Sequence, residues 1–492
     1  MAIKFFETDL VGAGTQISTT SAVAISNGDT LLIGRGVNII STGSVAISTG
    51  NTSGIRNLNL EISGFVAGAS GAVNISNFSD TQQRAVNYDI VVSSTGRLLG
   101  DEQAGIFATG HTSAQAGSIR VTNAGEIASL DRYALQLWRV TEVFVVNDGS
   151  ITSNSDFEGA VSIGADSTTI INTGLISSVA ALLQPDSATI NSADSFTSPG
   201  DTLTLINTGT IASANVVFSG VFTDDLIQNS GTMIGRLFMF EGDDVVVNSG
   251  FIEGLVSMGE GNDTYDGRRG TVTGEILGLE GDDTLFGGAG EEIIRGGADN
   301  DTIRGGGARD ELYGEDGNDL ILGQDGKDLL DGGAGEDELR GGDGEDSLIG
   351  GAGEDTLLGG FGDDRLDGGD DNDLLRGNKG EDLAFGGLGD DKIRGDDGND
   401  DLFGNAGNDF LTGDRGDDLI EGGRGNDRID GGVGIDTAVF AGDQANYTIQ
   451  LLNNGDIRVT DNVGNDGVDR ISTVEFFEFS DGVVAVADLF AI

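Results

Sequence analysis

The chain has 492 residues, of which 82 are Asp or Glu and 26 are Lys or Arg, so its formal net charge is −56. This acidic balance argues against nucleic acid as a partner, because phosphates carry the same sign of charge. It also argues against an anionic membrane surface, unless a cation bridges the two. The chain contains no Cys, so disulfides do not stabilise it.

Neither a cleaved export signal nor a membrane span is predicted. Residues 1–9 lack a long apolar segment and a small-residue cleavage site. No stretch of the chain reaches the about 18 apolar residues that a membrane-spanning helix needs.

Residues 1–240 repeat a short strand, a polar corner and a second strand. The corner is Asn-x-Gly at Asn123, Asn147, Asn172, Asn207 and Asn229, and again at Asn248, with spacings of 24, 25, 35, 22 and 19 residues. A right-handed parallel β-helix allows such variable rungs, because loops can lengthen on one face while the strands stay stacked. We predict this fold for residues 1–240. A β-sandwich with Asn-Gly hairpins is the alternative.

One stretch of the first half concentrates aromatic and cationic residues, with Tyr133, Trp138 and Arg139 inside residues 131–139. Aromatic faces stack on sugar rings, which makes the stretch a candidate carbohydrate site, but packing under a loop explains the same residues. The single His of the chain, His111, stands in a polar segment and is expected to be exposed.

Residues 241–277 combine two periods. Acidic, Gly-containing turns end in Asp244, Asp263 and Asp283, at spacings of 19 and 20 residues, and the corner residue Asn248 falls among them. We predict that these transition rungs lead into the next region without a flexible linker, and that Asp244 and Asp263 are early metal ligands.

Residues 278–439 consist of 18 tandem copies of a nine-residue unit, without insertion or deletion. The consensus of the unit is Gly-Gly-x-Gly-x-Asp-x-Leu/Ile-x. Its glycines allow a positive φ and expose carbonyls, and its aliphatic residue points to a core from a three-residue strand. The sixth-place Asp can then meet the carbonyls of the turn. A cage of carboxylate and carbonyl oxygens suits calcium far better than zinc or copper.

A few units depart from this pattern. Ala384 and Ala438 replace the aliphatic residue at the eighth place, and Glu292 replaces the sixth-place Asp, which puts its metal site in doubt. The fourth-place Gly is replaced in three units, whose turns are expected to be distorted, at Asp299, Ala308 and Asp371.

The repeat resembles the RTX (repeats-in-toxin) calcium-binding parallel β-roll. In that family two units form one coil, and each ion lies between turns stacked on the same side. Residues 278–439 carry 45 Asp plus Glu against 13 Lys plus Arg, a net charge of −32, and two rows of turns have room for about 16 calcium ions. Folding would therefore accompany calcium binding. With Asp244 and Asp263, the resemblance gives as ligands Asp283, Asp301, Asp310, Asp319, Asp328, Asp337, Asp346, Asp355, Asp364, Asp373, Asp382, Asp391, Asp400, Asp409, Asp418, Asp427 and Asp436.

Residues 440–492 read as a small β cap. An Asn453-Asn-Gly455 turn between alternating strands predicts a hairpin, and residues 474–486 supply aromatic and aliphatic mass. A cap would cover the end of a solenoid, and a separate small binding module is the alternative. Residues 486–492 resemble the uncleaved type I secretion signals of RTX proteins, so we expect an extracellular or cell-surface location.

Two classes of function fit. The first is a calcium-dependent extracellular structural or adhesive protein, like the RTX proteins of surface layers and matrices, which folds on secretion and self-associates. The second is a secreted polysaccharide lyase or epimerase, because alginate epimerases combine a β-helix with RTX repeats. That chemistry needs a base, a charge neutraliser and an acid in one groove, but the chain has no Lys between Lys4 and Lys327. We predict no catalytic residues. Cell-surface polysaccharide is a second candidate partner.

Overall fold

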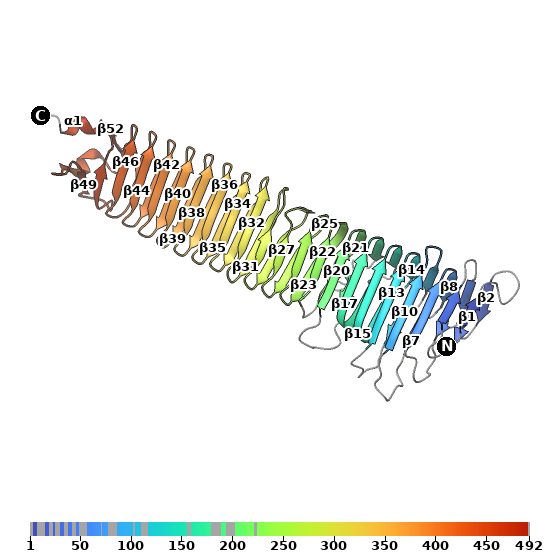
Figure 1. The fold of residues 1–492 in the computed structure, drawn as a ribbon. Coiled ribbons are helices and arrows are strands. Elements are labelled where there is room, and N and C mark those ends of the chain that lie inside the picture. The colour runs from blue at the N-terminus through green and yellow to red at the C-terminus, as the bar shows by residue number, and fades with distance from the viewer. Residues whose placement is uncertain are drawn as a thin grey trace. The chain divides into compact units, whose positions relative to one another are not determined.

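The structure, a computed structural model, describes residues 57–490 except 70, 77–85, 102–103, 110–116, 155–158, 179–187, 193–201 and 221–223. Before residue 57 it describes only 3–6, 15–18, 23–24, 30–33, 38–41 and 46–48. The chain divides into two compact units, residues 1–274 (unit 1) and 275–492 (unit 2). Both are built from β-strands, as predicted (Figure 1). Within the described ranges, no helix has the length and apolar character to cross a membrane.

Unit 1 is a parallel β-helix whose rungs each contribute strands to three sheets, and all its pairings in the described segments are parallel, which rules out a sandwich there. The first sheet contains β1 (Ile3–Phe6), β4 (Thr30–Ile33), β7 (Asn57–Ile62), β10 (Val86–Val92), β13 (Gly117–Asn123), β15 (Leu135–Asn147), β17 (Val161–Asn172), β20 (Thr202–Asn207), β22 (Leu226–Asn229), β24 (Val245–Asn248) and β27 (Thr264–Asp266). The second contains β2 (Thr15–Ser18), β5 (Asn38–Ser41), β8 (Phe65–Gly68), β11 (Arg97–Gly100), β14 (Glu126–Ser129), β16 (Ser150–Ser153), β18 (Leu175–Ser178), β21 (Thr210–Ser219), β23 (Thr232–Glu241), β25 (Phe251–Glu253) and β28 (Thr271–Val272). The third contains β3 (Val23–Ala24), β6 (Ile47–Ser48), β9 (Val73–Ser76), β12 (Ile106–Thr109), β19 (Ala188–Ser192) and β26 (Val256–Glu260), together with parts of β15, β17, β21 and β23.

The corner asparagines of unit 1 form a buried ladder between the first and second sheets. Each Asn donates its side-chain N–H to the Oδ1 of the corner Asn on the next rung, at 2.8 to 2.9 Å, from Asn123 to Asn248. These amides are at most 1 % exposed. The ladder satisfies polar groups that would otherwise be buried without partners, so Asn at this corner is needed on every rung regardless of loop length.

Unit 2 is a parallel β-roll of two sheets, in which the strand residues of the repeats pair with residues 18 positions later, so two nine-residue units make one coil. One sheet contains β29 (Ile276–Glu280), β31 (Ile293–Ala298), β33 (Glu311–Asp316), β35 (Leu329–Ala334), β37 (Ser347–Ala352), β39 (Arg365–Asp370), β41 (Leu383–Leu388), β43 (Asp401–Ala406), β45 (Leu419–Glu421), β47 (Thr437–Val439) and β51 (Phe476–Phe479). The other contains β30 (Thr284–Phe286), β32 (Thr302–Gly307), β34 (Leu320–Asp325), β36 (Glu338–Asp343), β38 (Thr356–Phe361), β40 (Leu374–Lys379), β42 (Lys392–Asp397), β44 (Phe410–Arg415), β46 (Arg428–Val433) and β50 (Val468–Ser472).

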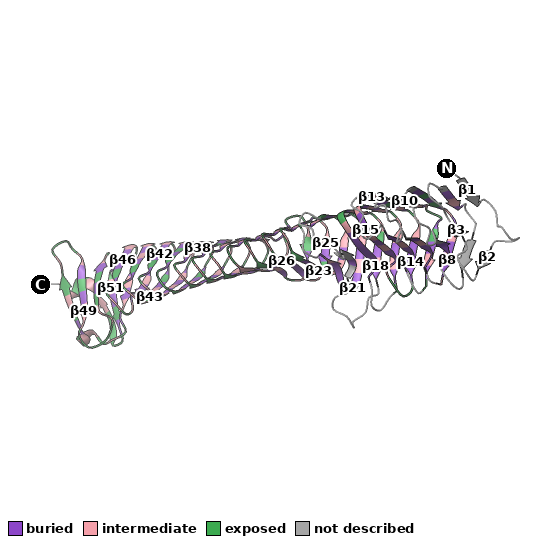
Figure 2. Ribbon diagram, turned by 90° about the horizontal axis from the view of Figure 1, so that it is seen from below, coloured by how far each residue is buried: buried purple, intermediate pink, exposed green. Residues whose placement is uncertain are grey.

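The eighth-place residues form the core of the roll. All 18 are at most 1 % exposed, including Ala384 and Ala438, while their strand neighbours are half-buried or exposed (Figure 2). One aliphatic side chain for every nine residues is a thin core, so the apolar burial of unit 2 is small for its length.

The strands of the roll are longer than predicted. Most have six residues, because pairing continues through the first three places of the following unit. The first-place glycine, Gly359 in β38, has no partner in the register of its ladder. The β-ladder is therefore interrupted at the first-place glycine and resumes at the next residue.

The turns keep one backbone shape even where glycine is absent. The second and fourth places have positive φ in most units, for example 115° at Gly351 and 131° at Gly353. Asp299, Ala308 and Asp371 take φ of 74°, 77° and 76° at the fourth place, so their turns have the left-handed conformation and not the expected distortion. Stacking on both neighbouring coils holds these residues in a conformation that glycine adopts more readily.

Residues 440–490 pack on the last coil. Strands β50 and β51 pair in parallel with β46 and β47, in the places of a further coil. The predicted hairpin consists of β48 (Tyr447–Leu451) and β49 (Ile457–Asp461), with Gly455 at φ 97° in its turn. A 3-10 helix (Gln444–Asn446), β52 (Gly482–Ala485) and α1 (Val486–Leu489) complete this segment, which we call the C-terminal cap.

Candidate calcium-binding ladders

The sixth-place acids of unit 2 form two buried ladders, one along each row of turns. The main-chain N–H of Asp337 donates to Oδ1 of Asp355 at 2.8 Å, and the N–H of Asp355 donates to Oδ1 of Asp373 at 2.9 Å. The same contact recurs from coil to coil in both rows. Every sequence-predicted ligand from Asp244 to Asp436 is at most 3 % exposed.

The second carboxylate oxygen has no hydrogen-bond donor. Within the described part of unit 2, Oδ2 is buried and accepts no hydrogen bond in the sixth-place residues Asp301, Asp310, Asp319, Asp328, Asp337, Asp346, Asp355, Asp364, Asp373, Asp382, Asp391, Asp400, Asp409, Asp418, Asp427 and Asp436. A buried carboxylate oxygen without a donor is costly, so a repeating row of them indicates a positive partner.

The oxygens available to that partner crowd the first-place glycines. A Cβ placed on Gly350 would be 2.4 Å from Oδ2 of Asp355 and 2.5 Å from the carbonyl oxygen of Gly368 on the next coil. A carboxylate oxygen and a carbonyl oxygen thus converge beside the glycine, in a cradle that a side chain at this position would disrupt. We use the word cradle for this arrangement throughout.

Burial perturbs these carboxylates in the absence of a cation. Desolvation raises the pKa of Asp355 to about 7, and raises that of Asp364 to about 8 with a further contribution from the neighbouring ladder charges of Asp382 and Asp346. The charged ladder is therefore unfavourable alone and becomes favourable when a divalent ion supplies compensating charge.

The donor set suits calcium. Among the described residues, no three Asp, Glu, His or Cys side chains gather closely enough to hold a metal ion by themselves. The cradles instead combine carboxylates with main-chain carbonyls, which are the hard oxygen ligands of calcium in flexible geometry. When bound, calcium would neutralise the ladder charge and tie successive turns together.

Glu292 begins the second row and differs from the other rungs. Its main-chain N–H donates to Oδ1 of Asp310 at 2.8 Å, as in the rest of the ladder, but its own Oε2 accepts a hydrogen bond from the N–H of Gly288 at 3.1 Å. The longer side chain folds back onto its own turn, so its carboxylate is partly satisfied by the protein.

Both ladders end in acids of the C-terminal cap that sequence reasoning missed. The N–H of Asp427 donates to Oδ1 of Asp469 at 2.9 Å, and the N–H of Asp436 donates to Oε2 of Glu475 at 3.0 Å. The last cradle, at Gly431, faces Oδ2 of Asp436 and the carbonyl oxygen of Thr473. The only signal in the sequence was an acid two residues before a buried apolar residue, as in Asp469-Arg-Ile471.

Unit 1 contains a shorter ladder of the same kind. Asp244 and Asp263 are 0 % and 1 % exposed, and the N–H of Asp244 donates to Oδ1 of Asp263 at 2.7 Å. The ladder also includes Asp225, which the sequence analysis overlooked and whose N–H donates to Oδ1 of Asp244 at 2.6 Å. Asp225 lies 19 residues before Asp244 and two before the buried Ile227, which was the available signal.

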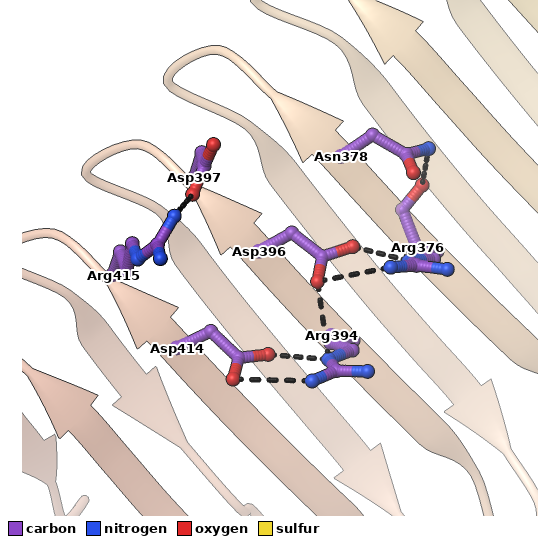
Figure 3. Close-up of polar contacts among 7 residues, drawn as sticks. All are labelled: Arg376, Asn378, Arg394, Asp396, Asp397, Asp414 and Arg415. Carbon is purple, nitrogen blue, oxygen red and sulfur yellow. Dashed lines mark hydrogen bonds and ion pairs between the residues drawn. The ribbon is translucent and has the colours of Figure 1, made fainter.

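Other acids of the roll pair with arginines on its outer surface. Arg376 and Arg394 reach Asp396, and Arg394 also reaches Asp414, with Nη2 of each arginine 3.2 Å from the carboxylate of the following coil (Figure 3). Asp396 and Asp414 occupy the second place at φ 77° and 73°. These carboxylates therefore serve an ion-pair network and lie outside the cradles.

The candidate carbohydrate stretch falls on β15. Trp138 is partly buried and donates its indole N–H to Oγ of Ser162 at 3.1 Å, on the neighbouring strand β17. Tyr133 precedes β15 and Arg139 lies within it. His111, which was expected to be exposed, lies outside the described residues.

A comparison with protein-family models agrees with the calcium-binding repeats. The family model of the RTX calcium-binding nonapeptide repeat matches residues 275–303, 304–339, 340–375, 367–402, 376–411 and 403–438. No curated protein matches the chain. Among solved structures, the chain is similar to a hyperactive, Ca²⁺-dependent, β-helical antifreeze protein from an Antarctic bacterium, with 17 % identity over 73 % of this chain and 94 % of that one, at a TM-score of 0.32. Residues 275–438 are therefore RTX calcium-binding nonapeptide repeats, in a chain whose described residues form an all-β solenoid fold.

Proposed function

We propose that the protein is a non-enzymatic extracellular structural or adhesive protein, which folds when it meets calcium and then self-associates into a surface layer, matrix or fibre. The observation that carries the proposal is the pair of acid ladders, whose Oδ2 atoms are buried without donors in the described part of the roll. Unit 2 has one core aliphatic residue for every nine, so cations and not apolar burial hold its coils.

This dependence on calcium favours an extracellular site of action. Extracellular calcium sites typically have dissociation constants of about 10⁻⁴ to 10⁻³ M, which cytosolic calcium does not reach. A chain with a net charge of −56 stays extended without a cation. It could therefore cross a type I secretion channel unfolded and fold outside, where calcium also removes the charge that opposes self-association.

A calcium titration of the purified chain tests the proposal. Circular dichroism would follow folding, and electron microscopy and analytical ultracentrifugation would follow assembly, with magnesium as the control cation. We expect a transition from coil to β-structure in calcium but not in magnesium, followed by ordered arrays or filaments.

Other outcomes contradict separate parts of the proposal. Folding into dispersed monomers would refute self-association, and release of unsaturated uronides or a change in uronate stereochemistry from added polysaccharide would identify an enzyme instead. A chain that is already folded in chelator would refute calcium-driven folding.

A further inference from the structure

We propose that unit 1 holds a calcium ion of its own, outside the matched repeats, bound by the carboxylates of Asp225 and Asp244 and by the main-chain carbonyl of Met239. The site lies at the corner where the third sheet of the β-helix turns into the first, since these acids follow β21 and β23 and precede β22 and β24. The proposal rests on the calcium chemistry of the proposed function but concerns a different part of the chain.

The acids at this corner repeat the contacts of the roll. The N–H of Asp225 donates to Oδ1 of Asp244, and the N–H of Asp244 to Oδ1 of Asp263, at 2.6 and 2.7 Å. The preceding residues form the same outer ladder as the fifth-place residues of the roll, because the N–H of Asp243 donates to Oδ1 of Asp224 at 3.0 Å. Two independent contacts thus recur at a spacing of 19 residues instead of 18.

The backbone of these turns also has the shape found in the roll. Phe240 and Gly242 take φ of 78° and 125°, and Gly259 and Gly261 take 129° and 132°, at positions that correspond to the second and fourth places of a repeat unit. Turns with this shape direct their carbonyls toward the neighbouring rung. The similarity of this turn to a repeat unit is not evident from the sequence, because Met239 occupies the position of the first glycine.

A cradle is present beside Gly220. A Cβ on that glycine would be 2.3 Å from the carbonyl oxygen of Met239 and 2.9 Å from Oδ2 of Asp225. The corresponding distances at Gly350 are 2.5 Å to the carbonyl and 2.4 Å to the carboxylate. The same two kinds of oxygen therefore converge beside a glycine in unit 1.

One carboxylate at this corner has no partner for its second oxygen. Asp244 is 0 % exposed, and among the described residues no donor reaches its Oδ2. Buried acids stacked 19 residues apart are compatible with a folded rung when a divalent cation lies between them.

Hydrogen–deuterium exchange of the full chain, in chelator and in calcium, tests the site. Calcium should slow exchange at least tenfold in peptides covering residues 203–230 and 239–250. Asp244→Asn should abolish that response, whereas the control Asp243→Asn, which removes an exposed charge one residue away, should keep it. The single Trp of the chain, Trp138, lies in unit 1 away from this corner, so unchanged fluorescence would show that the variants fold.

Two results would overturn the site without touching the proposed function. One is calcium-independent protection of residues 203–250 while residues 300–430 still respond. The other is a crystal structure of the wild-type chain grown in calcium, with ions in the roll but none beside Gly220. Loss of the calcium response in residues 300–430 would instead refute calcium-driven folding of the roll.

Discussion

Gly350→Ala is the sharpest test of the cradles. The substituted Cβ would lie 2.4 Å from Oδ2 of Asp355 and 2.5 Å from the carbonyl oxygen of Gly368, so it would push apart the two oxygens that would hold the ion. Gly350 does not have a positive φ, unlike its neighbour Gly351 at 115°, so alanine brings no backbone strain. Any effect must therefore come from the filled cradle.

The size of the effect follows from binding linkage. A site with a dissociation constant of about 10⁻⁴ M stabilises the folded chain by about 1.4 kcal/mol at 1 mM calcium and by about 2.7 kcal/mol at 10 mM. Overpacking adds about 1 to 3 kcal/mol that does not depend on calcium. Between these concentrations the variant should thus gain about 1.3 kcal/mol less than the wild type.

Urea unfolding followed by circular dichroism at both calcium concentrations measures this difference. The matched control is Gly307→Ala, whose Cβ would meet nothing nearer than Cα of Ala289 at 3.8 Å, and which should behave as the wild type. If Gly350→Ala gained as much from calcium as the control does, the cradle would not be a metal site.

Three further outcomes follow. In calcium-stripped protein the raised folded-state pKa values, about 7 for Asp355 and about 8 for Asp364, mean that the folded form binds more protons than the unfolded form. Stability should therefore fall as pH rises from about 4 to 8, and circular dichroism should show more β-structure at pH 4.5 than at pH 8. Asp355→Asn should raise the folded fraction of calcium-stripped protein at pH 8, by up to about 4 kcal/mol, yet lower the urea midpoint in calcium; a change of the same sign in both conditions would contradict the cradle assignment. Asp396→Gly should change the free energy of unfolding by less than about 1 kcal/mol, because it removes surface ion pairs whose arginines are exposed but relieves a positive φ; a larger loss in urea unfolding would show that the Arg376 and Arg394 network is a main stabilising element.

The repeating parts of the fold could be predicted from the sequence, because the same residue type has the same physical role at each equivalent position of the repeat. An unbroken nine-residue register forces the coil of 18 residues, and the corner Asn residues predict the stacked rungs of unit 1 even though their spacing varies from 19 to 35 residues. In both cases, buried polar groups must be satisfied on every rung, so the residue recurs wherever the structure does.

Contacts made by residues outside the sequence repeats could not be predicted from the sequence. Asp469 completes the first row of the roll from 42 positions after Asp427, because the cap hairpin is inserted between them. Asp225 was missed because its turn lacks the glycine pair. Strand length was underestimated, since the pattern of side chains does not reveal that pairing resumes after a glycine that leaves the ladder.

The C-terminal cap resolves a difficulty that the ladders create. Each rung hydrogen-bonds to an acid on the following coil, so a roll made only of repeats would leave two N–H groups and two cradles incomplete at its end. Asp469 and Glu475 supply those acids, and Thr473 supplies the carbonyl for the cradle at Gly431. The eighth-place residue of the last unit is Ala438, which pairs with Phe477, a buried residue whose ring lies 5.5 Å from that of Phe440. The cap therefore covers the end of the core with aromatic residues and completes the calcium ladders at the same time.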